Sequence, residues 1–460
     1  MKQSKFILLL FLISFFIRAL IFQFYLSKNE NYWQIDSNTY HVIAQNIAQN
    51  CKISADGQKP NFYRLPGYPL FLAACYKIFG ENKILALWVQ ILFSSLIPVL
   101  IFFLSLTLFP TNLLLAQVSS LYSCFQLGLV LYSGFFMTES LFIFFFLLFA
   151  ILFFSFDRKN FFLAGIFLGL ASLVRPVGHY LIVLSILILF FSALRSSSDG
   201  GLPRRSLGED GFINKIKKIL LIFVGWFIII FPWLLRNYLL LGQIFFHTLP
   251  GGHFLYFSAT RVCMVPNNFT YQESRQKIEK EVKENFDKQE TKLGRKLTDI
   301  ESCNIMQNLA IKYFKKYPLV TLKHWFTDIL RTSLSLYSGE LVLLENKREH
   351  PNYFSKNHNI WCMFKRYLSP QTDNIFLKII IYLEILFFVF ILVGFFMCLI
   401  KFNFAQNFIL LKILLFIFLF LFIGLSGGFS RMRLPLEPFL IILSFKWWLT
   451  FLQNREILGV

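Results

Sequence analysis

The chain has 460 residues, of which 56% are hydrophobic in type, 15% are charged and 60 are phenylalanine. Soluble domains average about 45–50% apolar and about 25% charged residues. Both values deviate here in the direction of a membrane protein, which excludes an ordinary soluble enzyme, a disordered chain and a disulfide-stabilised scaffold. The sequence therefore predicts an all-α polytopic membrane protein.

The net charge of +20 comes from 45 basic and 25 acidic residues. In a protein that crosses the membrane many times, lysine and arginine collect on cytoplasmic loops because they fix the topology. We therefore expect contacts with membrane lipids and no nucleic-acid partner. The cysteines show no metal-ligand spacing, and the sequence leaves open whether Cys51 and Cys75 form a disulfide.

About ten segments are apolar enough to enter a bilayer, whose hydrocarbon core needs about 20 residues per helix. The first of them is too long for the apolar core of a signal peptide, so we expect it to be retained as a span. The ten segments are residues 6–26, 84–109, 112–131, 140–156, 161–174, 177–194, 219–240, 376–400, 408–425 and 436–452.

The basic stretch from Arg195 to Lys218 lies between two of these spans and fixes that connection in the cytoplasm. Two long segments are then extracytoplasmic. The predicted organisation is an N-terminal membrane module (1–240) with a catalytic first outer loop (27–83), a large, mostly helical outer loop (241–375), and C-terminal transmembrane helices (376–460).

Both outer loops show apolar residues at helical spacing. In the first loop we expect two interfacial amphipathic helices, at 37–50 and 68–79. In the large loop we expect a charged helix over 273–299, with Ile278, Val282 and Phe286 on its buried face. The predicted helices that follow it cover 305–317 and 319–336.

This topology places the unusual polar residues of the apolar regions at the same, outer side of the membrane. Charges at membrane depth cost several kcal/mol when unpaired, so they usually pair or line a polar cavity. Each residue has a structural alternative: the acids as helix caps, the arginines as snorkelling anchors, the histidine as a satisfied interior side chain. The residues are Asp36, Arg64, Glu139, Arg175, His179, Arg236, Arg431, Arg433 and Glu437.

Such a group of residues has a chemical logic. Arginine side chains and helix termini suit a phosphate group at the membrane surface. A nearby carboxylate suits a general base that deprotonates an acceptor hydroxyl. Attack on an anomeric carbon passes through an oxocarbenium-like state, and a phosphate leaving group stabilised by arginine needs no acid. A lipid-linked sugar phosphate fits both the apolar helices and the polar cavity.

The layout resembles the membrane-embedded C-type glycosyltransferases, which use polyprenyl-phosphate sugars. It is similar to their bacterial branch, near protein O-mannosyltransferases, lipid A aminoarabinose transferases and lipopolysaccharide-core transferases. Six matching pieces carry the resemblance: DSNTY (36–40), RLPGYPLFLA (64–73), TE (138–139), GLASLVRP (169–176), PWLLRN (232–237) and SRMRLPLEP (430–438).

The resemblance implies a bundle of about ten spans and an inverting transfer at the outer side, with Asp36 as the catalytic base and Glu139 as its partner. It further implies phosphate-binding arginines and cavity-lining residues. The expected donor-phosphate ligands are Arg64, Arg175, Arg236, Arg431 and Arg433; the expected acceptor or cavity residues are Tyr40, Tyr63, Tyr68, His179, Trp233 and Glu437. Two departures stand out: Ser37 follows Asp36 where many eukaryotic members have a glutamate, and the large loop lacks a β-trefoil pattern.

The expected partners are a polyprenyl-phosphate sugar and a lipid, glycan or protein acceptor, in a bacterial inner membrane with the site facing the periplasm. The sequence leaves open whether a divalent metal ion assists. Two other functions also need a polar cavity among discontinuous helices: a transporter or lipid-linked oligosaccharide flippase, and a glycan ligase or polymerase. A transporter, however, would be expected to have short loops and polar groups near mid-bilayer, whereas this chain has two long outer segments and charges at the ends of its spans.

Overall fold

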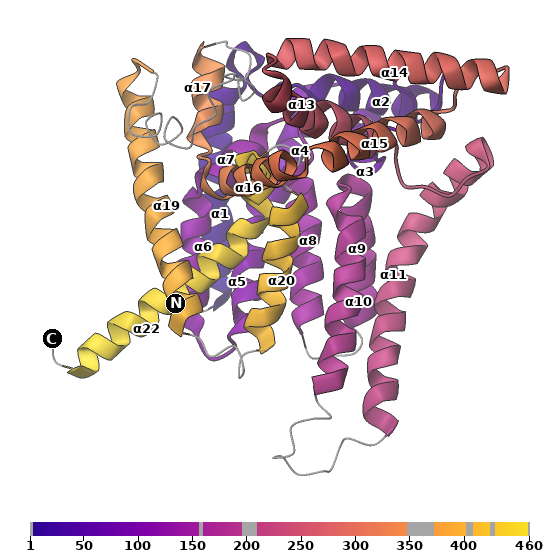
Figure 1. Ribbon diagram of the computed structural model, residues 1–460. Coiled ribbons are helices and arrows are strands. Elements are labelled where there is room, and N and C mark those ends of the chain that lie inside the picture. The colour runs from indigo at the N-terminus through magenta and orange to yellow at the C-terminus, as the bar shows by residue number, and fades with distance from the viewer. Residues whose placement is uncertain are drawn as a thin grey trace.

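The computed structural model describes residues 3–155, 160–195, 209–346, 372–401, 408–423 and 428–458, and these residues are helical apart from loops and one isolated bridge between Ser54 and Pro60. Most membrane helices run side by side, and the helices of the large outer loop lie across one end of them (Figure 1). The all-α polytopic architecture predicted from the sequence is confirmed.

The ten apolar segments are helical over most of their described residues, and the chain is an integral membrane protein. Five regions are long enough to span a bilayer, one further pair of helices is bent by 51°, and four apolar helices are shorter. The helices of these regions are α1 (Gln3–Ile21), α4 (Lys83–Ser95), α5 (Ile97–Leu108), α6 (Leu113–Phe125), α7 (Leu127–Gly134), α8 (Glu139–Phe154), α9 (Asn160–Val174), α10 (Val177–Arg195), α11 (Glu209–Leu241), α19 (Ile375–Lys401), α20 (Phe408–Ile423) and α22 (Glu437–Leu458).

Several of these helices are interrupted near the end of the bundle that carries the outer loops. Between α7 and α8, the side-chain amide of Gln90 donates to the carbonyl oxygens of Ser133 and Phe135 at 2.9 and 2.7 Å. Between α9 and α10, Pro176 follows Arg175 and ends the first helix, because the residue before a proline avoids helical geometry. Free backbone groups at membrane depth need such partners, and the breaks bring polar side chains into the bundle.

The first outer loop folds as predicted. It forms α2 (Ser37–Asn50) and α3 (Gly67–Phe79), whose apolar residues join the main core. Cys51 and Cys75 are both free thiols.

The large outer loop contains α12 (Leu249–His253), α13 (Thr260–Asn267), α14 (Tyr271–Leu293), α15 (Asp299–Lys316), α16 (Pro318–Leu334) and α17 (Ser338–Asn346). The expectation of one helix over 273–299 is wrong at its end. Gly294 adopts a left-handed φ of 65°, and Thr298 then starts α15 with a capping box. Ile278 and Val282 are buried in a separate apolar cluster, with Phe286 packed against it, as expected.

The cytoplasmic insert predicted between Arg195 and Lys218 falls largely outside the described residues, as does the part of the large loop from 347 to 371. The ends of α10 and α11 that flank the insert lie at the opposite end of the bundle from α2 and α14 (Figure 1).

Helices α9 and α11 pack with their backbones in close contact. A Cβ atom on Gly165 would lie 2.2 Å from the carbonyl oxygen of Ile222, and one on Gly225 would lie 2.2 Å from that of Phe162. Small residues that allow helix backbones to approach are a common basis of helix packing in membranes. This contact fixes α9, and thereby Arg175 at its end.

We predict that Gly165→Ala lowers the free energy of unfolding by about 1–3 kcal/mol, because the added methyl group meets backbone rather than a movable side chain. Thermal or chemical unfolding of the purified protein in detergent measures the change. Gly339→Ala is the control, since nothing lies within 4 Å of the corresponding Cβ position. Equal stability of the two variants would contradict the close α9–α11 contact.

Candidate active site

Asp36 occupies the position just before α2, yet its side chain makes no capping bond to the helix among the described residues. Its carboxylate instead receives a hydrogen bond from Arg64 Nη2 at 2.6 Å on Oδ1 and lies 3.5 Å from Arg431 Nη2 on Oδ2. The alternative that Asp36 serves only as a helix cap is therefore not supported by the geometry.

Glu139 is the first residue of α8 and is 1% exposed. Its Oε1 accepts a hydrogen bond from Arg175 Nη1 at 2.5 Å and lies 3.7 Å from Arg431 Nε. The hydroxyl of Thr138 lies 3.4 Å from the other carboxylate oxygen. The helix break before α8 thus directs this acid toward arginines from two other parts of the chain.

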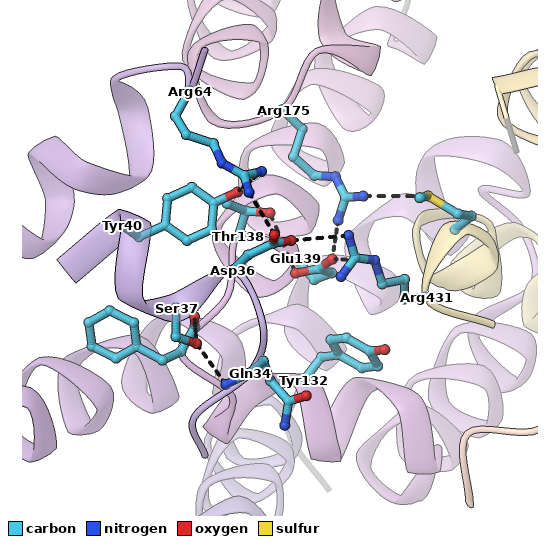
Figure 2. Close-up of polar contacts among 12 residues, drawn as sticks. Gln34, Asp36, Ser37, Tyr40, Arg64, Tyr132, Thr138, Glu139, Arg175 and Arg431 are labelled. Atoms are coloured by element: carbon cyan, nitrogen blue, oxygen red, sulfur yellow. Dashed lines mark hydrogen bonds and ion pairs between the residues drawn. The ribbon is translucent and has the colours of Figure 1, made fainter. Parts of the chain in front are cut away.

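Together these contacts form one cluster, in which Arg431 bridges the two acids (Figure 2). The cluster contains three guanidinium groups (Arg64, Arg175 and Arg431) and two carboxylates (Asp36 and Glu139), so its formal charge is +1. Its members come from the first loop, from two helix breaks and from the segment before α22. Burial in a low-dielectric region strengthens these interactions and makes an unpaired charge costly.

The electrostatic state of Asp36 reflects two opposing effects. Burial alone would raise the pKa of Asp36, but the charges and hydrogen bonds of Arg431 and Arg64 outweigh it and hold the pKa below the ordinary value of 3.8. Asp36 is therefore a carboxylate at neutral pH and can accept a proton.

Aromatic side chains support the first-loop half of the cluster. The Arg64 guanidinium lies over the rings of Tyr40 and Tyr63, 5.1 and 5.0 Å from their centres, and Arg64 Nη1 lies 3.4 Å from the Tyr40 hydroxyl. Tyr40 packs edge-on against Tyr68, whose hydroxyl donates to Gln90 Oε1 at 2.8 Å. Arg64 is thus fixed, through stacked rings, to the same glutamine that satisfies the α7–α8 break.

Ser37 is a site residue that the sequence reasoning noticed only as a departure from the family pattern. Its hydroxyl donates to the carbonyl oxygen of Phe136 at 2.9 Å and accepts the backbone N–H of Gln34 at 2.8 Å (Figure 2). A second bond, from Phe136 N–H to the Tyr32 carbonyl at 2.9 Å, parallels it. These bonds join the loop that carries Asp36 to the break that precedes Glu139.

Met432 and His253 are two further residues near the cluster that the sequence did not indicate. The sulfur of Met432 lies 3.7 Å from Arg175 Nη2. His253 ends α12 of the large loop, and burial lowers its pKa to about 4, with further lowering by the charge of Arg431 and a smaller opposing effect of Asp36. A neutral imidazole from the large loop therefore lies within electrostatic reach of the cluster. No sequence motif marked it.

Two of the expected phosphate ligands have other partners in this structure. Arg236 donates to the carbonyl oxygens of Asn61 and Ile53 at 3.1 and 3.2 Å, and its guanidinium lies 4.7 Å from the centre of the Trp233 ring. Arg433 is 2% exposed and donates to Glu437 Oε1 at 2.8 Å. Arg236 anchors the first loop, whereas Arg433 and Glu437 form a separate buried pair.

His179 of α10 and Trp233 of α11 both contact Phe246 in the segment that follows α11, and Trp233 Nε1 donates to the Phe246 carbonyl at 2.6 Å. The His179 ring stacks on that of Phe246, with 3.9 Å between the centres. Neither ring nitrogen of His179 has a hydrogen-bond partner among the described residues. The expectation of a satisfied interior histidine therefore does not describe its contacts.

Within the described residues, no three histidine, cysteine, aspartate or glutamate side chains come together as metal ligands. The two acids of the cluster have arginine partners. What the arrangement offers chemically is a carboxylate base beside a cationic surface for an anionic group.

We predict that Glu139→Gln lowers the free energy of unfolding by about 3 kcal/mol, because it leaves the Arg175 and Arg431 charges without their shared counter-ion. Chemical denaturation in detergent measures the loss. Glu279→Gln, in the exposed pair of Glu279 with Arg275, is the matched control and should change stability by less than about 0.5 kcal/mol. Equal effects would mean that the Glu139 pair is as weak as a surface pair.

The family model described as dolichyl-phosphate-mannose-protein mannosyltransferase matches residues 58–199, which include Arg64, Glu139 and Arg175. No curated protein matches the chain.

Two solved structures of an Archaeoglobus fulgidus oligosaccharyltransferase are similar. The form tethered to an acceptor peptide is 12% identical, with a TM-score of 0.50 over 96% of this chain and 49% of its own. AglB with an inhibitory peptide and a dolichol-phosphate is also 12% identical, with a TM-score of 0.53 over 99% and 52%. The present chain thus spans about half the length of these proteins.

ArnT from Cupriavidus metallidurans, in the apo state, is 15% identical over 90% of this chain and 73% of its own, with a TM-score of 0.34, too low to support a conclusion about the fold. The family model and the oligosaccharyltransferase structures confirm the resemblance to the C-type glycosyltransferases that the sequence predicts, at the level of the fold and of the segment 58–199.

Proposed function

We propose that the protein is an inverting membrane glycosyltransferase, which moves a sugar from a polyprenyl-phosphate donor to an acceptor hydroxyl. The observation that carries this proposal is the bridging of Asp36 and Glu139 by Arg431 at one end of an oligosaccharyltransferase-like bundle. It joins a base, a cationic surface and a membrane-embedded scaffold in one place.

The charge of the cluster suits the donor. A polyprenyl-phosphate sugar is a phosphodiester with one negative charge, and the five clustered side chains carry a formal charge of +1. The buried Nε atoms of Arg64 and Arg431 lack hydrogen-bond partners among the described residues. Guanidinium groups bind phosphate oxygens through such donors, so we assign the donor phosphate to Arg64, Arg175 and Arg431, and give Arg236 and Arg433 anchoring roles.

The reaction needs one proton transfer and one displacement. Asp36 takes the proton of the acceptor hydroxyl as the oxygen forms its bond to the anomeric carbon. The bond from that carbon to the phosphate oxygen breaks, and its electron pair remains on the phosphate. The arginines stabilise the charge that develops there, and attack opposite the leaving group inverts the anomeric centre.

Binding of the donor would also activate the base. In the ligand-free protein, Arg431 and Arg64 hold the pKa of Asp36 low, which makes it a weak base. A phosphate group that draws these guanidinium groups toward itself weakens their interaction with Asp36 and adds a negative charge nearby. Both effects raise the pKa of Asp36 and bring it closer to the value that general-base catalysis favours.

The transfer is assigned to the periplasmic side of a bacterial inner membrane. The basic stretch between Arg195 and Lys218, typical of a cytoplasmic connection, adjoins the helix ends opposite to α2 (Figure 1). The cluster lies at the α2 end. The acceptor is then a hydroxyl group on a lipid, glycan or protein outside the cytoplasm, at the end of the bundle where the large-loop helices lie (Figure 1).

Replacement of the base is the most direct test. We predict that Asp36→Asn lowers the rate of sugar transfer from a polyprenyl-phosphate donor at least about 100-fold, the usual contribution of a general base. Purified protein, radiolabelled donor and an extract of acceptors provide the assay. Asp56→Asn is the control, because Asp56 lies in the same loop but, within the described part of the chain, accepts bonds only from its own turn, from Gln58 and Lys59 N–H and the Ser54 hydroxyl.

Full turnover by a folded Asp36→Asn variant would remove Asp36 from the role of base. An equal loss in both variants would point instead to disruption of the first loop.

The pH dependence tests the activation of Asp36 by the donor. The profile of kcat/KM reports groups of the free enzyme and that of kcat reports groups of the donor complex. The pKa of Asp36 is below 3.8 in the free protein, so the acid limb of kcat/KM should fall only at pH values below about 4. The acid limb of kcat should lie at higher pH. If the two acid limbs coincide, or if that of kcat lies at lower pH than that of kcat/KM, donor binding does not raise the pKa of Asp36.

A further inference from the structure

Arg431 lies on α21 (Ser430–Arg433), a single helical turn at the start of a continuous helical segment. A 3-10 turn (Leu434–Leu436) and then α22 follow it without a gap, whereas residues 424–427 on its other side fall outside the described part of the chain. Besides this continuation into α22, contacts with α16 of the large loop hold the turn that carries Arg431.

Arg433 provides the first of these contacts. Its Nη1 donates to the carbonyl oxygens of Ser333 and Thr332, in the last turn of α16, at 2.6 and 3.2 Å, and its Nε donates to Glu437 at 2.8 Å. A cationic group at a helix C-terminus is favourable for both its charge and its hydrogen bonds. Arg433 thus fastens α21 to the end of α16.

Gly428 provides the second contact. It has a left-handed φ of 63°, and a Cβ atom there would lie 2.9 Å from Arg331 Cβ and 3.1 Å from the Asp328 backbone. The chain that enters α21 therefore rests directly on one turn of α16, the turn that carries Asp328.

That turn is held by a buried ion-pair network. Asp328 is fully buried and accepts two hydrogen bonds from Arg261 of α13, at 2.7 and 2.5 Å. Arg331 Nη1 lies 3.7 Å from the same carboxylate. A bidentate guanidinium–carboxylate pair fixes both distance and orientation, so α13 and α16 are held in one register.

We propose that Asp328 and Arg433 are positioning residues, which hold Arg431 between Asp36 and Glu139 by locking α16 against Gly428 and α21. The large loop is then part of the construction of the active site rather than only a cover over it. The inference deepens the proposed function and rests on it for its catalytic meaning, whereas the positioning itself is a property of the ligand-free protein.

The test uses two variants that leave the cluster residues unchanged, Asp328→Asn and Arg433→Lys. Asp328→Asn removes the charge that holds Arg261, and Arg433→Lys keeps a positive charge but cannot contact the α16 carbonyls and Glu437 at once, as the guanidinium group does. The readout is the pKa of the Asp36 carboxylate in the protein without donor. Infrared difference spectroscopy monitors the titration, and the band that disappears in Asp36→Asn is assigned to the Asp36 carboxylate.

Both variants should raise the pKa of Asp36 by about one unit or more, because withdrawal of Arg431 removes one of the two charges that lower it while its burial remains. The other titratable groups that interact electrostatically with Asp36, which are Arg64, Tyr40, Tyr63 and His253, are not substituted. Tyr313→Phe is the control: its hydroxyl bonds to Glu281 at 2.6 Å within the large loop, so the variant loosens the loop without touching α16 and should leave the Asp36 titration as it is.

An unchanged Asp36 pKa in the folded variants would overturn the proposal, as would an equal shift in Tyr313→Phe. If Asp328→Asn fails to fold, the more conservative Arg433→Lys decides. In the transfer assay, Asp328→Asn added to Arg431→Ala should cause no loss beyond that of Arg431→Ala alone. If the Asp36 titration shifts in the variants but the protein shows no transferase activity, the proposed function is wrong and the positioning role stands. If the protein is an active transferase but the Asp36 titration does not shift, the positioning role is wrong and the proposed function stands.

Discussion

The ion pairs of Arg431 with Asp36 and Glu139 are the interaction on which the rest of the arrangement depends. The pair of Arg431 with Asp36 joins residues 395 positions apart in the chain. Two carboxylates and three guanidinium groups would be prohibitively costly at this depth if they were separated. Together they neutralise one another except for a single positive charge, which makes the cluster both stable in the fold and receptive to an anion.

Interrupted helices are the structural means by which this cluster is built. A continuous helix satisfies its own backbone but directs no polar group into the bundle except from its side. At the breaks before α8 and after α9, the chain instead places Glu139 and Arg175 at helix ends. The free carbonyl oxygens that result are met by specific side chains, among them Gln90, so the breaks are stable parts of the architecture.

Much of the fold could be predicted from the sequence, because burial in a bilayer leaves a strong signal. The ten apolar segments are helical over most of their described residues, and the helices of the first loop begin and end close to their predicted limits. The helix expected over 273–299 is an exception, because its charged periodicity continues past Gly294. The positive φ of that glycine and the capping box at Thr298 divide the segment into two helices.

The site was predictable as a set of residue types but not as a set of contacts. Arg431 and Arg433 are two residues apart with similar surroundings in the sequence, yet one faces the two acids and the other fastens α16. Which arginine faces the acids and which contacts α16 depends on the direction of a single helical turn and on the distant residues Thr332 and Ser333. No local sequence pattern reveals either. The same holds for Asp36, whose position before α2 is equally suited to a helix cap.

The clustered arginines are proposed to form the binding site of a lipid phosphate. A cryo-electron microscopy structure of the protein in lipid nanodiscs with undecaprenyl phosphate is the decisive test. We expect the phosphate to lie within hydrogen-bond distance of at least two of Arg64, Arg175 and Arg431, with the lipid chain along the bundle. A phosphate bound elsewhere on the protein, with the five-residue cluster unchanged, would contradict this proposal.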